Sequence, residues 1–199
     1  MDWIQTHIRE VGIGTIVVAA LVAGTWVVSS SNATKAAAAS RALGEAQRSV
    51  ASGNLPLAAA DLQKVVQRYG STKAGTQAKL LLAQVLFEQG KVDEGLKMID
   101  QVGSAGALQP SLHGLRAAGL EQAGKPGEAA AEYLKAAQAT TLPSERESYR
   151  SDAARSYLAA GKKDEALKIW QDIAADPSST LNSEARLRVG ELTATVAKG

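Results

Sequence analysis

The sequence predicts an all-α protein: one N-terminal transmembrane helix, then an α-solenoid of about four helix-turn-helix repeats and a capping helix. Three observations predict this class. Four glycines recur 37, 34 and 37 residues apart, each between two helical patterns, and they are Gly53, Gly90, Gly124 and Gly161. Aromatic residues make up only 4% of the chain, and alanine and leucine dominate it, which favours helices. Val11–Val28 contains no charged residue.

The apolar segment Val11–Val28 comes first. As a helix it would extend about 27 Å, close to the thickness of a bilayer's hydrocarbon core. Trp3 and Trp26 would place one indole near each membrane interface. A signal peptide cleaved after Ser31 and Ala33, or a buried helix of a soluble domain, are the competing interpretations. The segment is longer than a signal-peptide core and has isoleucine and valine on every face, so we expect a retained anchor.

We therefore divide the chain into a tail and anchor, residues 1–31, and a repeat domain, residues 32–199. Within the anchor, Ala20 and Gly24 have the spacing that lets a second transmembrane helix approach closely, although ordinary small residues in an alanine-rich span explain them as well. The charges that flank the apolar segment favour one orientation in the membrane only weakly. Only Arg9 precedes the segment, whereas three cations follow it within 20 residues, which weakly favours a cytoplasmic repeat domain.

Each turn glycine separates a first helix, A, from a second helix, B. The expected pairs are Ala36–Ser52 with Pro56–Tyr69, Thr76–Gln89 with Val92–Val102, Pro110–Ala123 with Pro126–Ala139, and Ser144–Ala160 with Lys163–Ala175. A final stretch, Ser183–Val196, would cover the last pair, since an open stack needs a cap. Four of the five prolines lie at expected helix starts, where the missing N–H costs little. The glycines supply the left-handed conformation that ends each A helix.

The B helices share a pattern of residue sizes. Five positions after the glycines come the small residues Ala58, Gly95, Ala129 and Ala166. Nine positions after them come the large residues Leu62, Ile99, Tyr133 and Trp170, and twelve after them Val65, Val102, Ala136 and Ile173. These steps of four and three residues keep all of them on one helix face, so we expect that face to form the core.

On these residues the chain resembles the tetratricopeptide repeat family over roughly residues 36–178. The fourth unit matches best, with Gly161, Ala166, Trp170, Ile173 and Pro177 at the family's positions. The first unit departs from the pattern because it lacks the bulky pair on helix A, and the second has glycine where alanine is usual. The resemblance implies a superhelical stack that binds protein partners, since this scaffold serves many binding roles.

The overall layout, a single N-terminal membrane helix followed by about four such repeats, is similar to that of the ancillary subunits of the bacterial Sec translocon. This resemblance implies a single-pass inner-membrane protein whose repeats face the periplasm. It also implies association with translocon subunits and periplasmic chaperones, and a role in envelope protein export or folding. We therefore expect a periplasmic C-terminal domain, against the weak charge count. The alternative is a structural accessory subunit of another inner-membrane complex, held through its transmembrane helix.

In the repeat family, partners bind to the concave face lined by the A helices, 13, 10, 6, 3 and 2 positions before each turn glycine. Carried onto this chain, the resemblance implies the candidate groove residues Gln47, Val50, Leu80, Gln84, Phe87, Glu88, Glu121, Gln122, Arg155 and Leu158. Phe87 is the only phenylalanine, and if exposed it would be a natural hot spot for a peptide. Burial of Phe87 between helices is an equally good interpretation. The membrane residues that we name are Trp3, Val11, Ala20, Gly24, Trp26 and Val28.

The composition argues against catalysis and against nucleic acid as a partner. There is no cysteine, so disulfides, thiolate nucleophiles and cysteine metal sites are excluded. The two histidines, His7 and His113, are too far apart in the pattern to form a metal site. Gly119–Lys125 has part of a phosphate-loop spacing, but Pro126 stands where serine or threonine would hold magnesium. Charges are balanced and evenly spread, unlike a nucleic-acid-binding face. We expect no enzyme activity, no cofactor and no small-molecule substrate.

Overall fold

The computed structural model describes the backbone of residues 8–194 and the side chains of residues 29–194. Within these residues all regular secondary structure is helical, as expected. The helices are α2 (Ile8–Ala51), α3 (Leu55–Tyr69), α4 (Lys73–Glu88), α5 (Val92–Asp100), α6 (Gln109–Gln122), α7 (Pro126–Ala139), α8 (Pro143–Ala159), α9 (Lys163–Ala174) and α10 (Asn182–Ala194). A short 3-10 turn, η1 (Gly106–Leu108), precedes α6.

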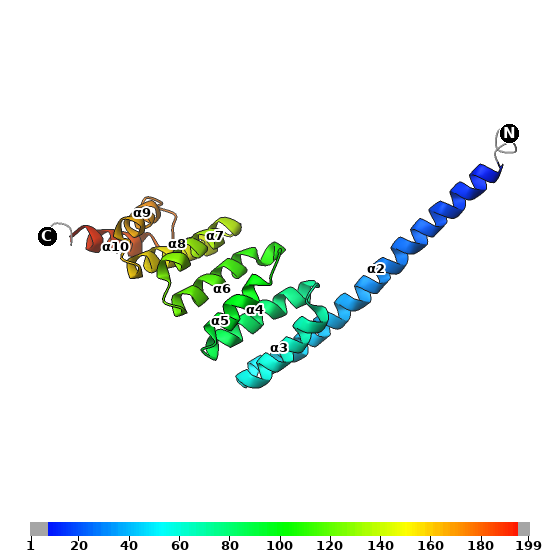
Figure 1. Ribbon diagram of the computed structural model, residues 1–199. Coiled ribbons are helices and arrows are strands. Elements are labelled where there is room, and N and C mark those ends of the chain that lie inside the picture. The colour runs from blue at the N-terminus through cyan, green and yellow to red at the C-terminus, as the bar shows by residue number, and fades with distance from the viewer. Residues whose placement is uncertain (1–7, 195–199) are drawn as a thin grey trace.

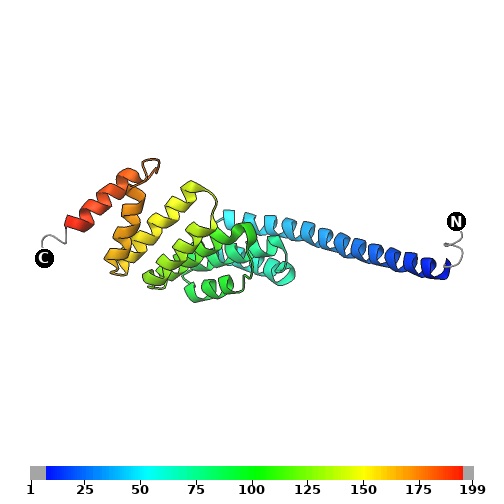
Figure 2. The same ribbon diagram turned by 90° about the horizontal axis from the view of Figure 1, so that it is seen from above.

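The helices form four antiparallel pairs that stack in chain order, α2 with α3, α4 with α5, α6 with α7 and α8 with α9 (Figures 1 and 2). Each pair packs against the first helix of the next pair, and α10 packs against α9 at the far end. The expected solenoid of four repeats with a capping helix is therefore confirmed for the described part of the chain.

Helix α2 is much longer than the first A helix that the sequence predicts. It runs without a break from Ile8 to Ala51, so it continues through the boundary expected at residues 31 and 32. Its 44 residues extend over about 66 Å, and its first half projects away from the stack (Figure 1). No glycine or proline interrupts residues 29–43, and the Thr34 hydroxyl donates to the carbonyls of Ser30 and Ser31 on the same helix. Nothing in this stretch therefore stops the helix.

The transmembrane expectation falls outside the side chains that the structure describes. Val11–Val28 and the membrane residues named above, from Trp3 to Val28, lie there. In residues 29–194, no helix is both long enough and apolar enough to cross a bilayer.

The four turn glycines have the left-handed backbone that the sequence predicts. Their φ angles lie between 72° and 75°. In the second to fourth units the glycine N–H and the following lysine N–H both donate to the end of helix A. For example, Gly90 N donates to the Phe87 carbonyl at 2.9 Å and Lys91 N to the Leu86 carbonyl at 2.8 Å. This hydrogen-bond pair is the Schellman motif, and it satisfies carbonyls that would otherwise lack a partner.

Side-chain caps fix two helix starts. Asn54 Oδ1 accepts a hydrogen bond from Leu57 N at 3.1 Å, and Thr72 Oγ1 accepts one from Gly75 N at 3.0 Å. The Thr72 cap explains why α4 starts at Lys73, three residues before the expected start. Apart from the start of α2, the other helix boundaries lie within about two residues of those expected.

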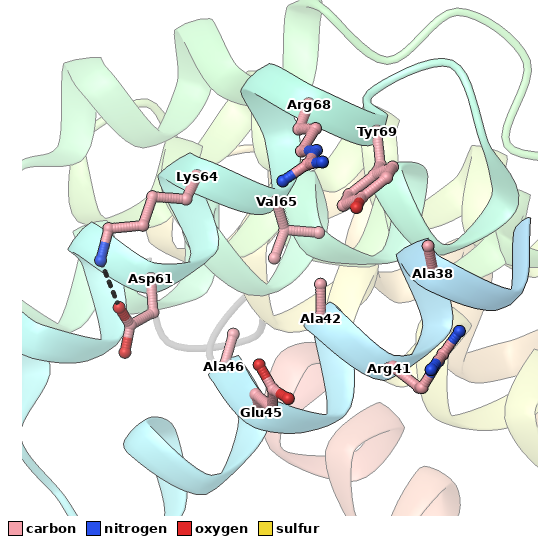
Figure 3. Close-up of a pocket in the computed structure, with 10 residues that line it drawn as sticks. All are labelled: Ala38, Arg41, Ala42, Glu45, Ala46, Asp61, Lys64, Val65, Arg68 and Tyr69. Atoms are coloured by element: carbon pink, nitrogen blue, oxygen red, sulfur yellow. Dashed lines mark hydrogen bonds and ion pairs between the residues drawn. The ribbon is translucent and has the colours of Figure 1, made fainter. Parts of the chain in front are cut away.

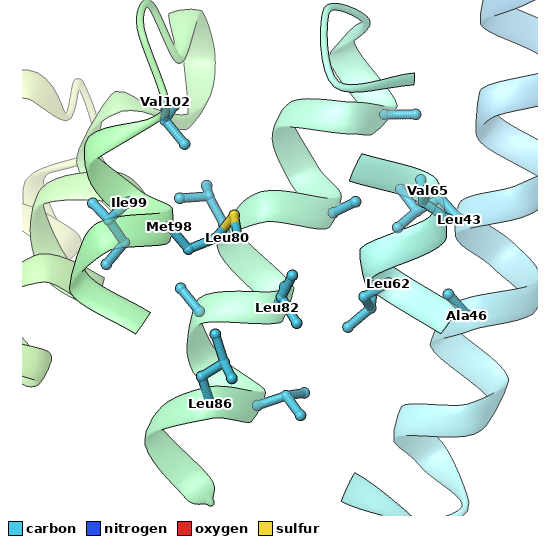
Figure 4. Close-up of a cluster of buried hydrophobic side chains, with 14 of the residues drawn as sticks. Leu43, Ala46, Leu62, Val65, Leu80, Leu82, Leu86, Met98, Ile99 and Val102 are labelled. Carbon is cyan, nitrogen blue, oxygen red and sulfur yellow. The ribbon is translucent and has the colours of Figure 1, made fainter. Parts of the chain in front are cut away.

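The core follows the predicted pattern of the B helices. All twelve residues five, nine and twelve positions after the turn glycines are buried. All of them except Gly95 and Ala136 belong to two clusters, one built from residues 39–112 and the other from residues 117–185, and Leu96 packs against both. Figure 4 shows part of the first cluster, in which Leu82 of α4 points toward Leu62 of α3, while Leu43 of α2 lies beside Val65 of α3 and Ile99 of α5 lies on the other side of α4.

Candidate partner-binding groove

A groove of about 580 Å³ runs along one face of the stack. Its walls come mainly from the A helices of the four units, α2, α4, α6 and α8. The lining residues are Gln47, Gln77, Leu80, Leu81, Gln84, Leu108, Ser111, Gly114, Leu115, Ala118, Tyr133 and Tyr149. We call this surface the concave groove.

The lining repeats with the period of the fold. In α4 it consists of residues 13, 10, 9 and 6 positions before Gly90, which are Gln77, Leu80, Leu81 and Gln84. In α6 the same four offsets from Gly124 give Ser111, Gly114, Leu115 and Ala118. Because the two A helices lie in register, equivalent side chains line the same groove, and a bound segment would meet the same helix face twice.

The chemistry of the concave groove is uncharged. Leucine and tyrosine side chains supply its apolar surface, and Gln47, Gln77 and Gln84 supply amide groups that both donate and accept hydrogen bonds. Gln84 Nε2 donates to Glu88 Oε1 at 3.2 Å, which orients that amide. A surface of this composition suits an uncharged stretch of polypeptide, whose own main chain has one donor and one acceptor per residue.

Tyr149 of α8 closes one end of the concave groove. Its ring lies against Gly114 of α6, where an added Cβ would meet the ring Cε1 at 2.8 Å. Burial, together with the nearby carboxylates Glu145 and Asp152, raises the pKa of the Tyr149 phenol above its ordinary value. The phenol therefore stays protonated at neutral pH and remains a hydrogen-bond donor.

Three of the ten candidate residues, Gln47, Leu80 and Gln84, line the concave groove. Val50 and Leu158 are partly buried and pack against the two core clusters instead. Glu88 and Gln122 are exposed but lie outside the groove lining.

Phe87, also in the candidate set, does not line the concave groove, and of the two interpretations that the sequence left open, burial between helices is the one observed. Only 6% of it is exposed. Its ring fills the space left by two glycines, Gly95 of α5 and Gly119 of α6. A Cβ at Gly95 would be 2.4 Å from Phe87 Cε1, and a Cβ at Gly119 would be 2.4 Å from Phe87 Cζ. Phe87 therefore packs the second unit against the third.

Glu121 and Arg155, also candidates, join helices rather than line the groove. Glu121 accepts hydrogen bonds from the Tyr133 hydroxyl of α7 at 3.1 Å and the Ser156 hydroxyl of α8 at 2.6 Å. Burial and the Glu121 charge raise the pKa of the Tyr133 phenol. Arg155 pairs with Asp152 at 2.7 Å and with Glu184 at 3.4 Å, which ties α8 to α10.

The sequence contained a signal for the groove residues that the candidate set omitted. The offsets of 13, 10 and 6 positions, applied to Gly124, give Ser111, Gly114 and Ala118. These small residues draw no attention as partner-binding side chains, yet they form the floor over which a ligand would lie. Tyr149 stands 12 positions before Gly161, outside the offset pattern, and no sequence feature singled it out.

A charged network on α6 and α7 is the other polar cluster of note. Glu132 pairs with His113 at 2.7 Å and with Lys135 at 2.6 Å, and Arg116 pairs with Asp100 at 2.8 Å. Burial opposes ionisation of Glu132, but hydrogen bonds from Lys135 and His113 outweigh it, so the pKa of this carboxyl lies below its ordinary value of 4.5. Across the described residues, no group of three or more His, Asp or Glu side chains could hold a metal ion.

The model of the tetratricopeptide repeat-like domain family matches residues 19–150. No curated protein matches the chain. Among solved structures, the chain is similar to a putative kinesin light chain with nearly identical TPR-like repeats from Podospora anserina. That match has a TM-score of 0.63 and 19% identity, and it covers 79% of this chain and 86% of the other.

Two further structures are similar as well. BtubC from P. vanneervenii has a TM-score of 0.59 and 14% identity, over 82% of this chain and 83% of its own. A thermophilic TPR protein from Thermus thermophilus has a TM-score of 0.53 and 19% identity, over 76% of this chain and 79% of its own. At these identities, the likenesses establish the fold alone.

Proposed function

We propose, because this chain belongs to the tetratricopeptide repeat-like domain family, that it is a membrane-anchored scaffold that binds proteins through its concave groove. The repeat fold is generally a non-enzymatic scaffold, and we propose that this chain has no catalytic activity either. One observation carries the proposal most directly: the concave groove has an uncharged lining that repeats at the same offsets in two units. A surface that repeats in this way can contact an extended polypeptide at more than one unit.

The bound polypeptide would be an uncharged segment of a protein. The leucines of α4 and α6 offer contacts to apolar side chains, and the glutamine amides at the same groove offer hydrogen bonds to the main chain. Because no charged side chain lines the groove, a charged segment would lose solvation there without finding a partner. Unfolded or partly folded envelope proteins present segments of the favoured kind.

Anchoring in the membrane is the second part of the proposal. Val11–Val28 is long enough to span a bilayer, and the similarity in layout to ancillary subunits of the Sec translocon favours a bacterial inner membrane with the repeats in the periplasm. An anchored groove has a high effective concentration near membrane complexes, so weak contacts are sufficient for binding. We propose that the protein assists export or folding of envelope proteins near the translocon.

Helix α2 also favours a second candidate, a structural accessory subunit of another membrane complex held through its transmembrane helix. Because α2 is one helix from Ile8 to Ala51, contacts made by its first half would fix the position of the whole stack. Replacing Val11–Val28 with an unrelated apolar segment separates the candidates. Loss of complex association in this variant supports the accessory role, and retained association supports the groove.

In-cell photo-crosslinking tests the scaffold role. A photoreactive residue at Ser111, which is exposed and lines the concave groove, is compared with one at Gln138, which is exposed on α7 outside it. We expect Ser111 alone to crosslink to translocon subunits or periplasmic proteins. Crosslinks to cytosolic proteins only would overturn the proposed orientation. Identical products from both positions would overturn the assignment of partner binding to the concave groove.

A binding variant provides the second test. Gln77→Arg with Ser111→Arg places two cations in the uncharged groove at exposed positions, so the fold should tolerate them. We expect these substitutions to abolish association with the partners identified by crosslinking, because a bound segment would bury each cation without a carboxylate to pair with it. Gln138→Arg is the matched control and should leave the association unchanged.

A further inference from the structure

A second groove lies at the end of the stack that is nearest the N-terminus. It has a volume of about 580 Å³ and lies between α2 and α3. Figure 3 shows its lining, in which Ala42, Ala46 and Val65 form an apolar floor and Arg41, Glu45, Lys64 and Arg68 stand around it. Ala46 and Val65 are buried, whereas the four charged side chains are exposed. We call this surface the end groove.

The repeat shows what kind of element covers this face elsewhere. Arg41 and Glu45 lie 12 and 8 positions before Gly53, and the same offsets from Gly90 give Ala78 and Leu82. Ala78 is fully buried and Leu82 is 2% exposed, because α3 of the preceding pair packs against α4. The equivalent face of α2 has no preceding pair within the described residues. Its natural cover is therefore one more α-helix, placed against α2 as α3 is placed against α4.

The charges around the end groove differ from those of the rest of the stack. Residues 29–69 hold five basic and two acidic residues, a net charge of +3, whereas residues 70–194 hold 15 basic and 16 acidic residues, a net charge of −1. Asp61 is already engaged, with Lys64 at 2.9 Å and with Ser49 at 2.8 Å. Among the described residues, Arg41 and Arg68 have no carboxylate within ion-pairing distance. The Arg68 guanidinium lies over the Tyr69 ring instead, 5.5 Å from its centroid.

We propose that the end groove binds an amphipathic α-helix of a partner protein whose polar face is acidic. The apolar face of this helix would cover Ala42, Ala46 and Val65. Its acidic residues would lie at the end of the groove formed by Arg41 and Arg68, away from the unpaired Glu45. Along α2 the groove extends from Ala38 to Ala46, about 12 Å, so the partner helix contacts it over two to three turns.

The end groove is separate from the concave groove. No lining residue is shared between the two, so a variant in one leaves the side chains of the other intact. Binding at the end groove can therefore be tested independently of the proposed scaffold function.

The test uses two helical peptides derived from this chain. The probe is a labelled peptide with the sequence of α3, Leu55–Tyr69, in which Lys64 and Arg68 are both replaced by Glu. The comparison peptide has the unchanged α3 sequence, and it keeps the same apolar face but a basic polar face. Binding to the full-length protein in a mild non-ionic detergent is measured by fluorescence anisotropy at low ionic strength. We expect the acidic peptide to bind about tenfold more tightly than the unchanged one.

Charge reversal in the protein provides the control. Arg41→Glu with Arg68→Glu should remove the preference for the acidic peptide, while Lys168→Glu with Arg186→Glu, exposed on α9 and α10, should leave it unchanged. Circular dichroism checks that each variant keeps its helices. The groove variant Ser111→Arg should also leave the preference unchanged.

Three outcomes would overturn the inference. Equal binding of the two peptides would show that the charges do not select the occupant. A preference that Ser111→Arg changes would assign the acidic peptide to the concave groove. Sedimentation showing a dimer that Arg41→Glu dissociates, with no peptide bound, would make a second copy of this chain the occupant.

Discussion

Phe87 and the two glycines around it provide the sharpest test of how the second and third units are joined. The perturbation is Gly95→Ala, alone and combined with Phe87→Ala. In the structure an alanine Cβ at position 95 would lie 2.4 Å from Phe87 Cε1 and 2.6 Å from Phe87 Cδ1. The ring cannot simply move aside toward α6, because Gly119 already contacts it there.

The magnitude follows from two opposed effects. Overpacking a core typically costs about 1–3 kcal/mol, because side chains or backbone must shift. Replacing glycine by alanine inside a helix stabilises it by about 1 kcal/mol. Gly95→Ala should therefore destabilise the wild-type protein by about 0–2 kcal/mol. In the Phe87→Ala protein, which itself loses about 3–5 kcal/mol, the clash with the ring is removed and only the approach to the Ala83 carbonyl oxygen, at 3.0 Å, remains. Gly95→Ala should therefore stabilise that protein by up to about 1 kcal/mol.

The assay is urea unfolding of the full-length protein in detergent, followed by circular dichroism. The quantity of interest is the difference between the effects of Gly95→Ala in the two backgrounds, which we expect to be about 1–3 kcal/mol. Gly44→Ala is the matched control, since it lies in helix α2 and an added Cβ there meets no atom within 4 Å. It should stabilise both backgrounds equally. If Gly95→Ala changed the free energy of unfolding by the same amount with and without Phe87, as we expect of Gly44→Ala, the reasoning would be refuted.

Further predictions concern the turns, the core and the pH dependence of stability. Gly161→Ala should cost about 1–2 kcal/mol in thermal or urea unfolding, because φ is +74° there. Trp170→Ala should cost about 3–5 kcal/mol in the same measurement, because the indole is fully buried. The pKa of Glu132 is lowered, so the stability it contributes is complete above pH 4.5 and is lost as the pH falls through its lower folded-state pKa. Glu132→Gln should therefore flatten the stability profile below pH 4.5, which urea unfolding at stepped pH would measure.

The helices could be predicted closely because their end signals are local. A glycine with φ above +70° ends a helix whatever surrounds it, and a proline at a helix start needs no tertiary contact. The B-helix core was predictable for a related reason. Its small, large and third apolar residues recur at fixed offsets from the turn, so one rule covered Ala58, Leu62 and Val65 and their equivalents in every unit.

The position of Phe87 could not be predicted in the same way. Its offset from the turn glycine places it on the family's concave face, but the space that receives its ring is made by Gly95 and Gly119, on two other helices. Only three-dimensional packing brings these residues together. The length of α2 was missed because a local signal is absent. Nothing in residues 29–37 marks a helix end, and the boundary expected at residues 31 and 32 rested on the apolar segment alone.

Helix α2 is a wall of both grooves and part of the core, which limits how the two surfaces can influence each other. Gln47 faces the concave groove, Arg41 faces the end groove, and Leu43 is buried in the first core cluster. Side chains that turn by about 100° per residue allow one helix to serve all three. Since a close-packed core resists displacement, a partner in one groove cannot move α2 without unseating Leu43. The two grooves should therefore bind partners independently. The same packing fixes the direction in which α2 leaves the stack toward Val11–Val28.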